Sequence, residues 1–138
     1  MRQIIDKPLW IGNARDARDL QSIHDHGIQA VVDLAAEEPP AVLSRDLVYC
    51  RFPLLDGSGN PAWLLRSAIE SVTRLISSDV PLLVACSAGM SRSPVIVAAA
   101  LATVNRQPMD ECLTQILSDG PQQVSAPLVN DVQAHMDD

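Results

Sequence analysis

Short aliphatic segments that resemble buried strands alternate with helical segments along this chain of 138 residues. The strand-like segments are Leu9–Ile11, Ile28–Leu34, Leu47–Leu55 and Pro81–Ala85. They are nearly continuous in apolar residues, which is typical of strands covered on both faces of a parallel sheet. This alternation predicts an α/β fold with a central, mainly parallel sheet that is flanked by helices on both faces.

Start and stop signals mark the helices. Asn60 and Pro61 supply an N-cap and a first-turn proline ahead of an apolar stripe at helical spacing, which predicts a helix over 62–77. A polar-faced helix is predicted over 16–26, ending at Gly27. We expect three more helices, over 93–104, 109–117 and 127–136.

Length and composition predict one globular domain over residues 1–138, because no repeat or linker divides the chain. A net charge of -7 argues against binding to nucleic acid or to anionic membranes, since both need basic surface. No apolar run approaches the about 20 residues of a membrane helix, and the N-terminus lacks a signal-peptide pattern. We therefore expect a cytoplasmic protein. The spacing of Cys50, Cys86 and Cys112 argues against a disulfide framework or a zinc site.

The segment VACSAGMSRSP, residues 84–94, joins the last predicted strand to a helix. Five residues with short or unbranched side chains separate Cys86 from Arg92: Ser87, Ala88, Gly89, Met90 and Ser91. Their backbone N–H groups and the helix N-terminus predict a cradle for a phosphate- or sulfate-type anion. Arg92 adds a planar fork of donors for two oxygens, and a thiolate at Cys86 would face the bound phosphorus. We expect Cys86 to be the nucleophile.

Attack on a phosphate ester also needs a proton for the leaving oxygen. Asp56, in the glycine-rich segment LLDGSGN, is the best candidate, although an ordinary turn aspartate is the simpler alternative. The carboxyl ends of parallel strands share one edge of a sheet, which predicts that Asp56 lies near Cys86. The bare spacing of Cys86 and Arg92 arises often by chance, and a lone cysteine is usually a core residue. The strand before the loop and the helix after it favour the catalytic interpretation.

Residues 86–93 resemble the Cys-x5-Arg-Ser signature of the dual-specificity branch of the cysteine-dependent protein tyrosine phosphatases. Asp56 precedes Cys86 by 30 residues, close to the spacing in that family. Four other segments are similar to parts of the same family: LWIGNARDA, HGIQAVVDLAAE, YCRFPLLD and GPQQVSAPLVNDV. The resemblance covers nearly the whole chain and implies hydrolysis of phosphoproteins or small phosphomonoesters, without a metal or another cofactor.

The resemblance also implies a role for each site residue. Cys86 would form a phosphocysteine while Asp56 protonates the leaving group, and Asp56 would then act as base on a water molecule. Arg92 would bind phosphate and stabilise both transition states. Ser93 would hydrogen-bond the cysteine sulfur. Asn13 matches a position that buttresses the loop, although a turn residue is the simpler account.

One departure keeps alternatives open. Ala85 occupies the position before the nucleophile where family members usually carry histidine, so we expect a less well supported thiolate or a less rigid loop. The first alternative is a phosphate-binding module with weak or no catalysis. The second is a rhodanese-like sulfurtransferase, which also cradles an anion beside a cysteine but needs no general acid. Cys50 could form a protective disulfide with oxidised Cys86, and inert burial is the simpler interpretation.

Overall fold

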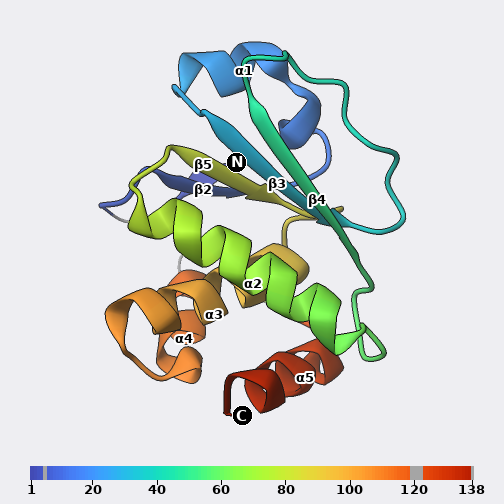
Figure 1. The fold of residues 1–138 in the computed structure, drawn as a ribbon, viewed down its shortest axis with the longest axis vertical. Helices are drawn as coiled ribbons and strands as arrows, with labels where there is room; N and C mark the ends of the chain where they lie inside the picture. Colours follow the sequence, from blue (N-terminus) through green and yellow to red (C-terminus); the bar gives the residue numbers. More distant parts are fainter. Residues whose placement is uncertain (5, 119–122, 138) are drawn as a thin grey trace.

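The computed structural model describes residues 1–4, 6–118 and 123–137. Five strands form one sheet in the order β1-β2-β5-β3-β4 (Figure 1). Four of them pair in parallel: β2 (Leu9–Gly12), β5 (Leu82–Ala85), β3 (Ala30–Ala35) and β4 (Val48–Leu54). The fifth, β1 (Arg2–Gln3), pairs antiparallel with β2 at one edge. The predicted mainly parallel α/β sheet is therefore confirmed.

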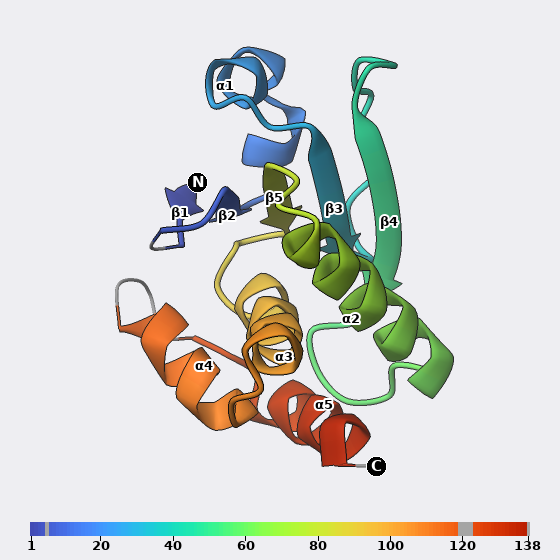
Figure 2. The same ribbon diagram turned by 60° about the vertical axis from the view of Figure 1, so that its left-hand side comes forward.

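Helices cover both faces of the sheet, but unequally (Figure 2). On one face lie α2 (Ala62–Ser77) and α3 (Arg92–Asn105), with α4 (Met109–Leu117) and α5 (Ala126–Asp137) packed beyond them. On the other face lie a 3-10 turn, η1 (Asp16–Arg18), and the short helix α1 (Leu20–Asp25). No helix in the described ranges is long and apolar enough to cross a membrane.

Residues of β5 show why this strand is apolar throughout. Leu82 and Val84 belong to the large core under α2 and α3, whereas Leu83 and Ala85 belong to the smaller core under η1 and α1. Successive side chains of a strand point to opposite faces, so both sets must be apolar when both faces are covered. The strand therefore stays fixed between two cores and delivers Cys86 to the edge of the sheet.

Helix α3 is buried at every residue from 92 to 102. A helix that is apolar all round is typical of a central position, and α3 has the sheet, α2, α4 and α5 as neighbours. Its first residue, Arg92, therefore lies inside the protein, close to the carboxyl end of β5. Helices α2 and α4 have the predicted bounds, and α5 begins one residue before the prediction.

The continuous helix predicted over 16–26 is wrong. Asp19 interrupts it with φ -90° and ψ 87°, and its side chain accepts a hydrogen bond from the Ser22 amide at 3.1 Å. Aspartate is favoured as an N-cap because its carboxylate satisfies a free amide of the first turn. The chain therefore forms the turn η1, stops, and begins α1 as a separate helix.

Candidate active site

The loop between β5 and α3 wraps around a buried sulfur. Cys86, which directly follows β5, is 2% exposed, and Arg92 at the start of α3 is 3% exposed. The Gly89 amide donates a hydrogen bond to the Cys86 Sγ at 3.2 Å. The loop thus directs at least one backbone N–H group at the sulfur, which is the property of an anion cradle.

The loop is anchored to the end of β2. The Cys86 amide donates to the Gly12 carbonyl at 3.3 Å, and the Ala14 amide donates to the Ser87 carbonyl at 3.1 Å. Gly89 has φ +73°, and a Cβ atom at this position would lie 2.9 Å from the Gly12 carbonyl oxygen. Glycine is therefore required here both for its backbone conformation and for the close approach of two chain segments.

The other end of the loop is tied to the segment that precedes α5. Ser91 is 5% exposed, and its Oγ accepts a hydrogen bond from the Ser125 amide at 2.9 Å. Its carbonyl oxygen accepts from the Val95 amide at 3.0 Å, which closes the first turn of α3. Both ends of the loop are thus held by groups that are distant in the sequence.

Arg92 forms a two-pronged ion pair with Glu37, which lies in the loop after β3. Its Nη1 donates to Glu37 Oε1 at 2.6 Å and to the Leu54 carbonyl at 2.9 Å, and its Nη2 donates to Glu37 Oε2 at 2.8 Å. Its Nε is buried and has no hydrogen-bond partner among the described residues. A guanidinium carries two N–H groups on each Nη and one on Nε. One N–H of Nη2 and the N–H of Nε, on the same edge, are therefore unused.

The ion pair alters the pKa of both partners. Hydrogen bonds from Arg92 lower the pKa of Glu37 below its ordinary value of 4.5. Burial acts to lower the pKa of Arg92, but the hydrogen bonds and the charge of Glu37, with the nearby Cys86 and Asp56, raise it overall. The carboxylate and the guanidinium therefore each favour the charged form of the other.

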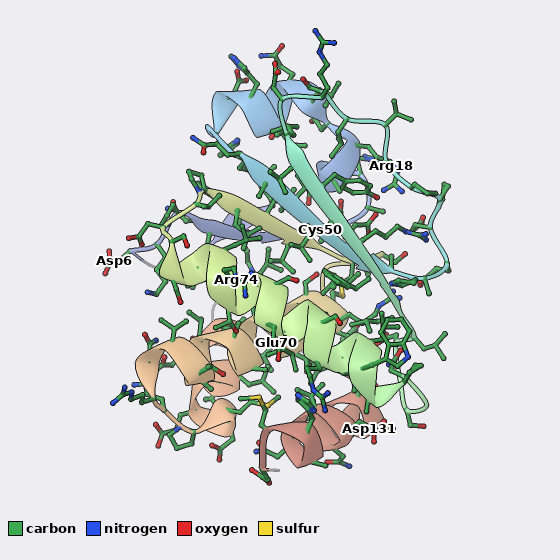
Figure 3. The ribbon with its side chains drawn as sticks, in the orientation of Figure 1. Asp6, Arg18, Cys50, Glu70, Arg74 and Asp131 are labelled. Carbon is green, nitrogen blue, oxygen red and sulfur yellow. The ribbon has the colours of Figure 1, made fainter. Side chains whose placement is uncertain are left out.

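Two arginines brace the loop that carries Glu37. Arg51, on β4, donates from Nη2 to the Glu38 carbonyl at 2.7 Å. Arg18, at the end of η1, donates to the Pro39 carbonyl and lies beside this loop in Figure 3. Because both guanidinium groups bind backbone oxygens, they fix the path of the loop and thereby the position of the Glu37 carboxylate.

A buried hydrogen-bond network supports the same loop further along. The Tyr49 hydroxyl donates to Asp33 Oδ2 at 2.7 Å and accepts from the Ala41 amide at 3.0 Å. Asp33 is 2% exposed, so this hydroxyl supplies a donor to a carboxylate that water hardly reaches. Burial is the main cause of the raised pKa of Tyr49. The loop is therefore held at Glu38, Pro39 and Ala41, all in its first half.

A pocket of about 230 Å³ joins these groups. It is lined by Glu37, Asp56, Cys86, Ser87, Ala88, Met90, Ser91, Arg92 and Gln123. Asp56 is exposed, and Asn60 closes its loop: Asn60 Oδ1 accepts from the Leu55 amide at 2.7 Å, and Nδ2 donates to the Leu55 carbonyl at 3.0 Å. The structure thus brings Asp56 into the same pocket as Cys86 and Arg92.

Two expected side-chain contacts are not formed in the described part of the chain. Ser93 is fully buried, but its Oγ has no hydrogen-bond partner, so the expected bond to the Cys86 sulfur is absent. The Asn13 side chain makes no hydrogen bond to the described residues of the loop: its Oδ1 accepts from the Asp16 amide at 2.9 Å, while the Asn13 amide donates to Asp16 Oδ2. Asn13 is therefore a turn residue, and the neighbouring Ala14 amide makes the contact with the loop.

Cys50 lies away from this site. It projects from β4 towards α2 and lines a separate pocket of about 320 Å³ that also includes Glu70 and Arg74 (Figure 3). Cys50 and Cys86 are both free thiols and line different pockets. This arrangement does not support the alternative of a disulfide between them.

Glu37 and Gln123 line the pocket but were not predicted from the sequence, and Glu37 is the one that binds Arg92. In the sequence, Glu37, Glu38 and the two following prolines stand out only as the end of a strand. The available signal was weak: an acidic residue at the carboxyl end of a parallel strand next to the one that carries Cys86. Its partner Arg92 is 55 residues away, and no local pattern connects the two.

The sequence of this chain is similar to those of known phosphatases. Residues 9–134 match the family described as dual specificity phosphatase, catalytic domain. Dual specificity protein phosphatase 22-A from Danio rerio is 30% identical over 117 residues, which cover 84% of this chain and 55% of that protein. The chain thus spans about half the length of this curated relative.

Solved structures of similar proteins share the fold. Human DUSP28 matches with a TM-score of 0.81 at 17% identity, over 94% of this chain and 92% of that one. DUSP15 matches with a TM-score of 0.79 at 23% identity, over 97% of this chain and 86% of that one. At these identities the likeness concerns the arrangement of helices and strands.

Proposed function

This chain belongs to the dual specificity phosphatase catalytic-domain family, and we propose that it hydrolyses phosphotyrosine, phosphoserine or phosphothreonine esters through a phosphocysteine. One observation carries this proposal: the unused Nε–H and Nη2–H edge of Arg92, in the pocket that holds Cys86. Two parallel donors on one edge of a guanidinium match two oxygens of a phosphate group. A charged donor that is buried without a partner is costly, and a bound anion would relieve that cost.

In the first step, the Cys86 thiolate attacks phosphorus. The S–P bond forms as the bond between phosphorus and the ester oxygen breaks, and Asp56, as a carboxylic acid, gives its proton to the leaving oxygen. The Gly89 amide, 3.2 Å from Sγ, supports the thiolate before attack. The Arg92 edge and the other loop amides hold the oxygens that remain on phosphorus.

In the second step, water hydrolyses the phosphocysteine. The Asp56 carboxylate takes a proton from water as the water oxygen attacks phosphorus, the S–P bond breaks, and thiolate and inorganic phosphate are released. Ser93 would donate a hydrogen bond to the departing sulfur in this step. Its buried hydroxyl has no partner in the described structure, so it can turn without breaking a hydrogen bond.

Glu37 acts as a positioning residue in this proposal. It binds one N–H of each Nη, and the Leu54 carbonyl binds the second N–H of Nη1. The guanidinium is therefore clamped on two sides, and only its Nε–Nη2 edge remains for substrate. Clamping a flexible side chain before binding reduces the entropy lost when phosphate binds.

Hydrolysis of para-nitrophenyl phosphate in the presence of a metal chelator tests the proposal. We expect turnover in the wild type, none in Cys86→Ser and strongly reduced turnover in Asp56→Ala. Cys50→Ser is the matched control, because that thiol lines a different pocket, and it should keep its activity. Undiminished turnover in a folded Cys86→Ser variant would exclude the proposed nucleophile.

A phosphate-binding module without useful turnover is the second candidate. Ala85 in place of the usual histidine and the unpaired hydroxyl of Ser93 favour it, because both reduce support for the sulfur. The assay separates the two candidates. Folded wild type that binds inorganic phosphate but shows no turnover at acidic or neutral pH would establish the binding module.

A further inference from the structure

The charges of the pocket are unfavourable for a substrate that carries several negative charges. Arg92 is the only cationic side chain among the described residues that line it, and Glu37 already forms an ion pair with it. Cys86 and Asp56 add two acidic groups to the same lining. The residues outside the described ranges include no lysine or arginine, so they cannot add a cation.

Two arginines close to Glu37 do not offset this balance. Arg51 and Arg18 bind backbone carbonyls of the loop behind Glu37 rather than facing the pocket. Glu38 adds a further carboxylate at the rim, where its Oε2 accepts a hydrogen bond from Ser87 Oγ at 3.5 Å. Among the described lining residues and Glu38, carboxyl groups therefore outnumber guanidinium groups.

Phosphate binding adds negative charge to this surface. The backbone amides and the N-terminus of α3 compensate part of the charge, about half of an elementary charge in the case of a helix terminus. The side chain of Glu37 is 56% exposed and Glu38 lies at the rim, so cationic groups on a substrate can approach both carboxylates. Opposite charges at a rim raise the rate of association, and like charges reduce binding.

We infer that the site selects phosphomonoesters carried beside positively charged groups, as in a peptide with arginine or lysine next to the phosphorylated residue. Acidic carriers are disfavoured by Glu37 and Glu38 at the rim. This inference rests on the proposed phosphatase activity and specifies its substrate class.

Two phosphotyrosine peptides of equal length test the inference, one with arginine and one with glutamate on both sides of the phosphotyrosine. At about 0.05 M salt we expect kcat/KM to be about fivefold or more higher for the arginine peptide, mainly through KM. At about 0.5 M salt the ratio should approach one, because salt screens charges at an exposed rim.

Two variants test which carboxylate causes the preference for the arginine peptide. Glu38→Gln removes one rim charge, so the ratio between the two peptides should narrow about twofold. Glu70→Gln makes the same chemical change on α2, in the separate pocket with Cys50, and should leave the ratio unchanged (Figure 3). The two peptides are compared within each variant, so a general loss of activity cancels in the ratio of their kcat/KM values.

The outcomes distinguish this inference from the proposed function. If para-nitrophenyl phosphate is hydrolysed but the two peptides have equal kcat/KM at low salt, or the glutamate peptide is preferred, substrate selection by charge is overturned while the phosphatase stands. If neither peptide nor para-nitrophenyl phosphate is hydrolysed, the proposed function fails and this inference fails with it.

Discussion

Arg92 and Glu37 form a bidentate ion pair in which the side chain of the arginine is 4% exposed and that of the glutamate is 56% exposed. The buried partner is thus the group that faces the sulfur, and the exposed partner comes from a loop 55 residues earlier. The pair connects the end of β3 to the start of α3. It explains how a long side chain at a helix start is held in one orientation.

Removing the charge of Glu37 should weaken phosphate binding. In Glu37→Gln the guanidinium loses its charged clamp, and we expect kcat/KM for para-nitrophenyl phosphate to fall about tenfold. Competitive inhibition by inorganic phosphate should weaken in parallel, because both depend on the orientation of Arg92. Glu70→Gln is the control. A kcat/KM within twofold of wild type would show that Glu37 does not position Arg92.

The same pair predicts a pH dependence of stability. The pKa of Glu37 is lower in the folded protein than its ordinary value of 4.5, so its contribution to stability is present above that value and is lost as pH falls through the folded pKa. Urea unfolding should therefore show wild type more stable than Glu37→Gln near neutral pH. The difference should shrink as the pH falls below about 4.5. A difference that stays constant or grows on acidification would contradict the assignment.

Gly89 should tolerate no side chain. In Gly89→Ala the Cβ atom would lie 2.9 Å from the Gly12 carbonyl oxygen at φ +73°, so the loop must move. We expect the free energy of unfolding to fall by about 2 kcal/mol and activity to be lost. Gly57→Ala is the matched control, because an added Cβ there meets no atom within 4 Å. Equal stability of the two variants in urea would refute the requirement for glycine.

Asn60 should matter most for substrates with poor leaving groups. Its side chain closes the loop that carries Asp56, so Asn60→Ala should displace the proposed general acid. Protonation of the leaving oxygen is needed more for phenyl phosphate than for para-nitrophenyl phosphate, whose leaving group is stable as an anion. We expect kcat/KM, which reports formation of the phosphocysteine and not its later hydrolysis, to fall about tenfold for the first and only about twofold for the second. Asn105→Ala, at the end of α3, serves as control, and an equal loss on both substrates would argue against a role through Asp56.

Much of the fold was predictable because local signals and burial agree. Strand β5 is apolar throughout, and β3 is apolar apart from Asp33, since both faces of the sheet are covered. The start of α2 at residue 62 was predicted correctly, but the N-cap is Pro61, and the predicted N-cap Asn60 binds the Leu55 backbone instead. The two-residue strand β1 carries no periodic pattern. The stop at Asp19 was missed because an aspartate inside a polar-faced segment is compatible with a continuing helix until its carboxylate is seen as a cap.

The site was predictable where its residues are adjacent in sequence. The loop from Cys86 to Arg92 lies within one segment between a strand and a helix. Its amino-acid composition therefore predicted a loop that can bind an anion. The partner of Arg92 depends on the order of strands in the sheet, which places β3 beside β5. The hydrogen bonds of Ser93 and Asn13 depend on rotamers, and family resemblance was a poor guide to both.

Trapping the covalent intermediate tests the central claim most directly. Asp56→Ala should form the phosphocysteine from para-nitrophenyl phosphate, because that leaving group needs little protonation, and should hydrolyse it slowly for lack of a base. Rapid quenching in denaturant and peptide mapping by mass spectrometry should find one phosphoryl group on Cys86. Turnover in wild type with no phosphoryl group on Cys86 in this variant, or with the group on another residue, would contradict the mechanism.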